Sequence, residues 1–151
     1  MDLSAYEFTS RVEETHWWFV GRRKLFQKII QELDLGPDAR VLDVGSGVGS
    51  NMRLLQSLEF RKILGLDREK TAIDFCFQKG IPEVLEGDAC DLPFEDDSFE
   101  LVLATDILEH LEDDSKAVDE IVRVLVPGGR AIFTVPRFAF LWGALDELSQ
   151  H

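Results

Sequence analysis

Glycines and acidic residues in one segment have the types and spacing that suit binding of a nucleotide-like cofactor. Residues 41–51 read VLDVGSGVGSN, so Asp43 lies within an apolar run that Gly45 and Gly47 follow. A further acid, Asp67, ends the next apolar run, ILGLD. This pattern indicates a strand, a glycine turn, the start of a helix and an acid at the tip of the next strand. Such a unit binds the adenosine end of a cofactor, because the glycines let a ligand approach the backbone and the carboxylate accepts both ribose hydroxyls.

A second group of reactive residues follows a later apolar run, in the segment TDILEHLED. Asp106, Glu109 and His110 are spaced i, i+3 and i+4, so they would share one face of a helix. We expect them to be the catalytic residues, with His110 as a base or pocket residue. Two carboxylates and an imidazole can also bind a divalent cation, although we expect no metal here. The alternative is an ordinary helix whose acids occupy its first turn.

The N-terminal segment HWWFVGRR is a third candidate. His16, Trp17 and Trp18 can form a lid over a cofactor or an apolar acceptor, and Arg22 can bind a carboxylate. The alternative is structural, because aromatic residues also pack a helix against a sheet.

These residues must be positioned by alternating strands and helices. We predict a short aromatic helix at 6–19, an interruption at Gly21, and an apolar-faced helix that Gly36-Pro37 ends. The expected strands are 40–44, 62–66, 83–85, 99–104 and 130–135, and the expected helices between them are 49–58, 69–79 and 115–125. Asp114 or Ser115 can cap the last helix. We divide the chain into an N-terminal helical cap (1–36) and one cofactor-binding unit (37–151).

The strands contain continuous β-branched runs, such as VLDV and LVLA, which indicate burial on both faces of a mostly parallel sheet. Alternation with helices then predicts a doubly wound, Rossmann-like α/β fold of about five strands in the order 3-2-1-4-5.

Two cofactors use this architecture, NAD and S-adenosylmethionine, and three features favour the second. The glycine pattern is G-x-G-x-G rather than G-x-G-x-x-G. Asp43 would repel a pyrophosphate but suits a cationic amino-acid end. An acidic loop, GDACDLPFEDDSFE, precedes the strand at 99–104, and within it Asp88 and the Ala89 amide could bind the adenine edge.

Four segments together resemble the successive motifs of class I S-adenosylmethionine-dependent methyltransferases, in the subset that includes ubiquinone- and menaquinone-pathway enzymes. They are VLDVGSGVGSN, LGLDREKTAI, GDACDLPFEDDSFELVLATDILEHLED and AVDEIVRVLVPGGRAIFTVP, within residues 38–136. The resemblance implies a methyl transfer from S-adenosylmethionine that leaves S-adenosylhomocysteine. The segment around Asp106 also resembles the acid-x-x-Glu-His motif of metal-assisted O-methyltransferases.

The resemblance assigns a role to each cofactor-binding residue. The methionine portion would lie against the glycine turn and the end of the strand at 99–104, the ribose against the acid of ILGLD, and the adenine against that acid's neighbours and the acidic loop. The methionine portion would contact Asp43, Gly45, Ser46, Gly47 and Thr105. The ribose would contact Asp67, and the adenine would contact Leu66, Arg68, Asp88 and Ala89.

Composition narrows the choice of partners. The net charge is -13, with 16 basic and 29 acidic residues, which argues against a nucleic-acid partner. Cys76 and Cys90 form neither a disulfide framework nor a zinc site. No apolar run is long enough to cross a membrane. We expect a cytoplasmic protein without stable membrane insertion.

Compared with that family, the sequence is short at its C-terminus. The usual strands 6 and 7 are missing after GALDELSQH, so the expected strand at 130–135 would be an open edge. The apolar tail residues 138 and 140–142, or a second subunit in a homodimer, could cover it. The leading hypothesis is a methyltransferase acting on a small molecule, at oxygen rather than nitrogen or carbon. The alternative is a truncated, non-catalytic cofactor-binding or regulatory module, and the third hypothesis is an NAD-dependent enzyme.

Overall fold

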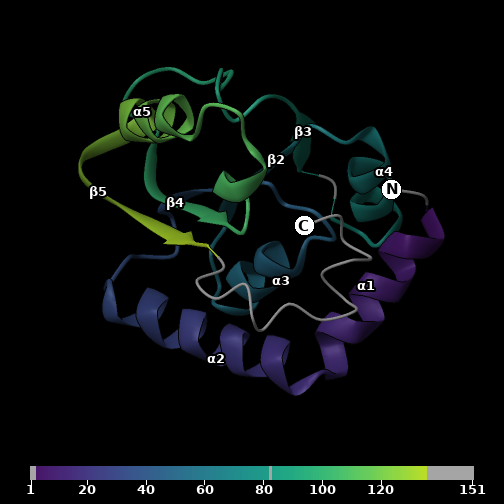
Figure 1. Ribbon diagram of the computed structural model, residues 1–151. Helices are drawn as coiled ribbons and strands as arrows, with labels where there is room; N and C mark the ends of the chain where they lie inside the picture. The colour runs from purple at the N-terminus through teal and green to yellow at the C-terminus, as the bar shows by residue number, and fades with distance from the viewer. Residues whose placement is uncertain (1–2, 82, 136–151) are drawn as a thin grey trace.

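The computed structural model describes residues 3–81 and 83–135 of the chain. Figure 1 shows a twisted sheet with helices on both faces. In chain order the elements are α1 (Leu3–Thr15), α2 (Trp17–Glu32), β1 (Arg40–Val44), α3 (Ser50–Ser57), β2 (Lys62–Asp67), α4 (Lys70–Gln78), β3 (Val84–Glu86), β4 (Phe99–Thr105), the 3₁₀ turn η1 (Leu108–His110), α5 (Asp114–Val124) and β5 (Leu125–Thr134).

The strands pair in the order β3-β2-β1-β4-β5, and each neighbouring pair is parallel. The predicted fold class and strand order are therefore confirmed. Central strands β1 and β4 are apolar and inaccessible to solvent at most positions, because helices cover both faces of the sheet.

Successive residues of a strand point to opposite faces, which gives this sheet two cores. Val41 and Leu101 belong to the core beneath α2 and α3, whereas Leu42 and Val102 belong to the core beneath α5. Figure 1 shows α5 on one side of the sheet and α2 with α3 on the other. Both layers leave the carboxyl ends of β1, β2 and β4 free to carry functional residues.

The N-terminal helices differ from the prediction in where they divide. The break lies at His16, whose backbone is extended, and α2 continues through Gly21. A glycine inside a helix costs roughly 1 kcal/mol relative to alanine. Burial of Phe26 and Ile30 in the core more than offsets that cost, so tertiary packing overrides the local signal.

The elements around β5 also differ in detail. Asp113, rather than Asp114 or Ser115, caps α5, because its carboxylate accepts the Lys116 N–H at 2.9 Å. Strand β5 begins at Leu125 and runs through Pro127-Gly128-Gly129 instead of starting at Arg130. An irregularity in its pairing, between Phe99 and Leu101 of β4, accommodates those turn residues.

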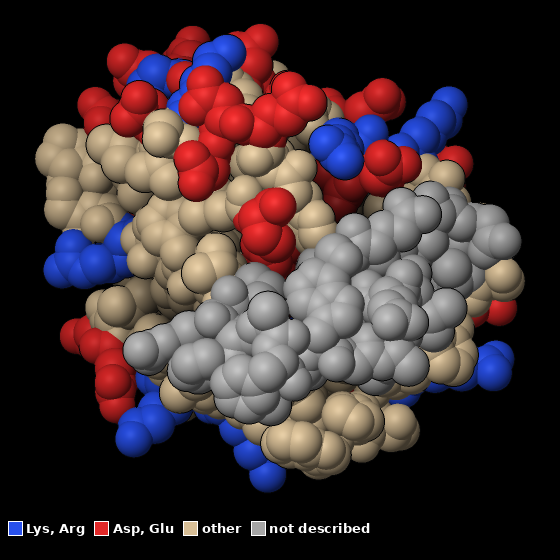
Figure 2. Space-filling view, viewed as in Figure 1, with Lys and Arg blue, Asp and Glu red and all other residues tan. Residues whose placement is uncertain are grey.

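The predicted tail, with its apolar residues at 138 and 140–142, lies outside the described residues. Within 3–81 and 83–135, no helix has the length and apolarity needed to cross a bilayer. Figure 2 shows Asp and Glu gathered on the part of this face that carries α5 and its neighbouring loops, with Lys and Arg more frequent along the opposite rim.

Candidate cofactor-binding site

The loop between β1 and α3 has a conformation that glycine alone adopts readily. Gly45, Gly47 and Gly49 all have positive φ, at 75°, 51° and 77°. A Cβ on Gly45 would lie 2.8 Å from the Ile107 side chain, so this position lacks both the conformation and the space for a larger residue. The amides of Gly45 and Ser46 donate to the Leu66 carbonyl, which fixes the loop against β2.

Asp67, at the end of β2, is held beside that loop by two backbone amides. Its Oδ2 accepts from Gly47 N at 2.8 Å and its Oδ1 accepts from Glu69 N at 2.9 Å. Only 9% of the residue is exposed. Its carboxylate is therefore oriented before any ligand arrives, and its remaining lone pairs can accept the hydroxyls of a ribose.

Asp43 lies beneath the loop and is fully buried. Asn51 Nδ2 donates to its Oδ1 at 3.0 Å and to Thr105 Oγ1 at 2.9 Å, which links β1, α3 and β4. Burial raises the pKa of Asp43 to about 7. Within the described residues, Asp43 Oδ2 and Ser46 Oγ are buried polar atoms without a hydrogen-bond partner. Such atoms fit a polar ligand at this end of the site.

Two adjoining hollows open along the carboxyl ends of these strands. The first encloses about 280 Å³ between β2, the loop after β3 and the segment after β4. The second encloses about 340 Å³ and extends past the glycine loop toward α1 and α2. Both are lined by Tyr6, Gly45, Asp67, Glu69, Asp106 and His110. The shared lining makes them one elongated cavity.

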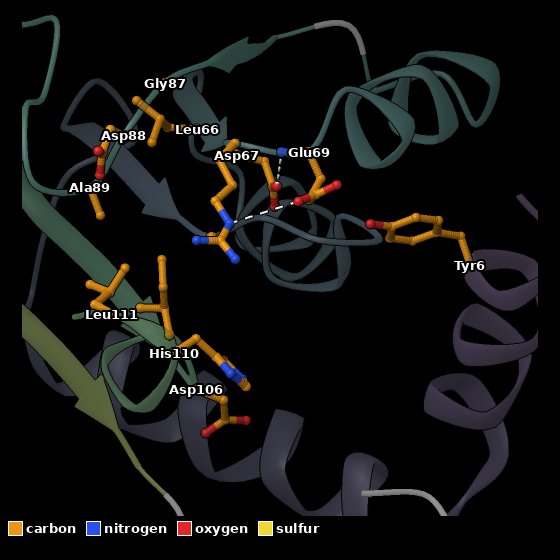
Figure 3. Close-up of a pocket in the computed structure, with 13 residues that line it drawn as sticks. Tyr6, Leu66, Asp67, Glu69, Gly87, Asp88, Ala89, Asp106, His110 and Leu111 are labelled. Atoms are coloured by element: carbon orange, nitrogen blue, oxygen red, sulfur yellow. Dashed lines mark hydrogen bonds and ion pairs between the residues drawn. The ribbon is translucent and has the colours of Figure 1, made fainter. Parts of the chain in front are cut away.

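Most of the predicted cofactor residues line this cavity. Figure 3 shows Asp88 and Ala89 near the end of β2, Asp67 and Glu69 next to them, and Asp106 with His110 across the opening from Asp67. Those predicted for the cofactor that line it are Gly45, Ser46, Gly47, Leu66, Asp67, Arg68, Asp88, Ala89 and Thr105, whereas Asp43 lines neither hollow. Arg22 lines it as well, whereas His16, Trp17, Trp18 and Glu109 are not among the lining residues.

Asp106 and His110 do not share an α-helical face with Glu109. Asp106 has a positive φ of 53°, and the 3₁₀ turn begins two residues later. Its Oδ1 accepts from Thr134 Oγ1 at 2.8 Å, and its Oδ2 forms an ion pair with Arg22. The carboxylate is thus directed at β5 and α2. Across the described ranges, no group of His, Cys, Asp and Glu is arranged to hold a metal ion.

The indole groups of Trp17 and Trp18 are 74% and 55% exposed. They stack edge-to-face on one another at the junction of α1 and α2. Burial against the sheet, the structural alternative, therefore does not apply to these two residues.

Several lining residues had no clear signal in the sequence. Tyr6 of α1 reaches the cavity and is 7% exposed, and burial raises the pKa of its hydroxyl to about 12, so the hydroxyl remains a donor. Figure 3 shows this hydroxyl directed toward Glu69 and Asp67. Glu13 of α1 and Asn51 of α3 also line the cavity. The one sequence feature that pointed to Asn51 was its place at the end of the glycine motif.

Residues 42–133 match the model of a family described as a methyltransferase domain. The chain belongs to this family. It is 33% identical over 129 residues to the uncharacterised methyltransferase YcgJ of Bacillus subtilis, covering 82% of this chain and 50% of that protein. It is 37% identical over 100 residues to the chloroplastic tocopherol O-methyltransferase of Arabidopsis thaliana, covering 62% and 29% of the two chains.

Among solved structures, PH0226 of Pyrococcus horikoshii superposes with a TM-score of 0.69 at 26% identity, covering 79% of this chain and 58% of that one. The chain spans between 21% and 50% of the length of the first curated relatives that it matches. Together with the confirmed fold, these matches place it among the class I S-adenosylmethionine-dependent methyltransferases.

Proposed function

We propose that the cavity binds S-adenosylmethionine and that the chain transfers its methyl group to an oxygen of a small-molecule acceptor. The observation that carries this proposal is the Asp67 carboxylate, fixed by the Gly47 amide beside the elongated cavity. The adenine would lie between Leu66, Asp88 and Ala89. The methionine end would then extend past Gly45 toward Ser46 and Thr105, where unpartnered polar atoms lie.

Methyl transfer requires alignment more than acid–base chemistry. Bound S-adenosylmethionine would supply a methyl group on a sulfonium, whose neutral thioether, S-adenosylhomocysteine, is a good leaving group. The fixed Asp67 holds the ribose hydroxyls, and the shape of the cavity aligns the acceptor for in-line attack, which limits the entropic cost of reaching the transition state. His110, which lines both hollows of the cavity, would take the proton of an acceptor hydroxyl.

Oxygen and a small acceptor are favoured by different observations. The His110 imidazole in the wall of the cavity suits an acceptor with a proton to lose, such as a hydroxyl. The relative from Arabidopsis thaliana is named for methylation at oxygen. The net charge of -13, with acids gathered on the face shown in Figure 2, disfavours a polyanionic acceptor such as a nucleic acid.

Isothermal titration with S-adenosylmethionine tests the cofactor. Asp67→Ala should weaken binding at least tenfold, because a charge-assisted contact to the ribose and the anchor of the glycine loop are both lost. Asp38→Ala, at an exposed aspartate that pairs with Arg61, is the matched control. Unchanged affinity in a folded Asp67→Ala variant would contradict the proposed site.

Turnover then separates an enzyme from a non-catalytic cofactor-binding module. Formation of S-adenosylhomocysteine would be followed with paired acceptors that differ only in a hydroxyl or an amine. Preference for the amines would refute oxygen as the target. We also propose that the chain can form a homodimer. Cofactor binding without turnover on any acceptor, in both monomer and homodimer, would favour the regulatory module.

A further inference from the structure

The cavity extends beneath α1, where Glu13 contributes a carboxylate to its lining. Ser50 Oγ, at the start of α3, donates to Glu13 Oε2. The Arg23 guanidinium donates to the backbone carbonyls of Glu13 and Glu14, which fixes this turn of α1 against α2. The carboxylate of Glu13 is therefore held in place next to the glycine loop.

This carboxylate has no ion-pair partner within the described part of the chain. Two arginines also line this part of the cavity, but the Arg22 guanidinium pairs with Asp106 and the Arg23 guanidinium donates to the backbone carbonyls of Glu13 and Glu14. Burial raises the pKa of Glu13, although the Ser50 hydrogen bond and the charges of Arg22 and Arg23 oppose that effect. Among the described residues the half-buried carboxylate has no direct contact with a cation, so a cationic ligand group would stabilise its charged form.

The course of the cavity indicates which ligand group reaches Glu13. With the adenine at Asp88 and the ribose at Asp67, the remainder of an adenosyl amino acid must run past the glycine loop into the hollow that Ser50 and Glu13 line. This step rests on the proposed function. We propose that Glu13 binds the α-ammonium group of the cofactor's amino-acid end, so that α1 forms part of the cofactor site and selects adenosyl compounds that carry this cation.

The inference predicts a coupling between one side chain and one part of the ligand. S-adenosylhomocysteine carries the ammonium, whereas 5′-methylthioadenosine retains the adenosine and thioether but has no amino-acid end. Glu13→Gln keeps the shape and the Ser50 hydrogen bond but removes the charge. Because a hydrogen bond to an ionised group is about twice as strong as a neutral one, we expect S-adenosylhomocysteine to bind roughly tenfold more weakly to this variant.

Isothermal titration of both compounds into the wild type and Glu13→Gln tests the coupling. Affinity for 5′-methylthioadenosine should change less than about twofold. Glu14→Gln, at the exposed neighbour on α1, is the matched control and should change neither affinity. An equal loss for both compounds would show that Glu13 merely supports the fold, which overturns the inference.

A second comparison needs no substitution and so does not depend on the variant folding. The desamino analogue of S-adenosylhomocysteine should bind the wild type at least tenfold more weakly than the parent compound. Equal affinities would overturn the role of Glu13 and leave the proposed function intact. Failure of both S-adenosylhomocysteine and 5′-methylthioadenosine to bind the wild type would refute the proposed function itself, and this inference with it.

Discussion

Replacement of Asp43 by asparagine tests how the site's buried charge affects stability. Burial raises the pKa of this carboxyl from 3.8 to about 7 in the folded protein. Between these two values the folded state binds more protons at Asp43 than the unfolded state does. The contribution of Asp43 to the free energy of unfolding therefore falls as pH rises from about 4 to about 7, and the loss is complete above that range. An asparagine side chain at this position would remain neutral and remove this dependence.

The magnitude follows from the difference between the two pKa values. At 1.36 kcal/mol per pKa unit, a difference of about 3 corresponds to roughly 4 kcal/mol over the whole range. About 3 kcal/mol of it is expected between pH 5 and pH 8. The carbonyl oxygen of the asparagine can still accept from Asn51, so any other effect of the substitution should be nearly independent of pH.

Urea unfolding at pH 5 and pH 8 measures this difference. Subtracting the wild-type free energy of unfolding from that of Asp43→Asn cancels the titration of all other groups. This difference should increase by about 3 kcal/mol in favour of the variant from pH 5 to pH 8. Asp38→Asn, at an exposed aspartate, should give a difference that changes by less than about 0.5 kcal/mol. Parallel profiles for wild type and Asp43→Asn would refute the reasoning.

Two further substitutions test the elements that hold the site. Gly45→Ala should lose more stability than Gly80→Ala. Both residues have positive φ, which costs a non-glycine residue about 1–2 kcal/mol of strain, but the new methyl group meets Ile107 only at position 45. Equal losses in thermal unfolding would exclude the clash. Arg123→Ala should lose about 1–3 kcal/mol, since its guanidinium donates to two loop carbonyls and two carboxylates, whereas Arg61→Ala at an exposed pair should lose less than about 1 kcal/mol. Urea unfolding that ranks the two variants equally would contradict the role of this network.

The parts of the structure that the sequence predicted correctly depend on local patterns. Apolar runs fix the strands, and the order of alternating elements restricts the sheet topology. Gly45 and Asp67 were recognisable as site residues because a glycine turn and a strand-end acid have a fixed relation within one β-α-β unit.

The parts that it missed depend on contacts between distant segments. Nothing local distinguishes Glu13 or Tyr6 from other residues on an amphipathic helix. Tyr6 reaches the cavity because α1 packs on α4, and Glu13 reaches it because Arg23 and Ser50 hold that turn of α1. Asp106 follows a helical spacing, but its contacts with Thr134 and Arg22 hold it in a left-handed conformation instead. Local spacing cannot reveal that competition, which tertiary contacts decide.

The bridge that Asn51 forms between Asp43 and Thr105 has a kinetic consequence. It joins β1 to β4, two adjacent strands that are separated in sequence by the whole α3-to-β3 segment. Closing so long a loop is slow compared with forming the local β1-α3 turn. The binding cavity is therefore completed only when this late pairing forms, so recovery of ligand binding during refolding would lag behind the recovery of helical signal.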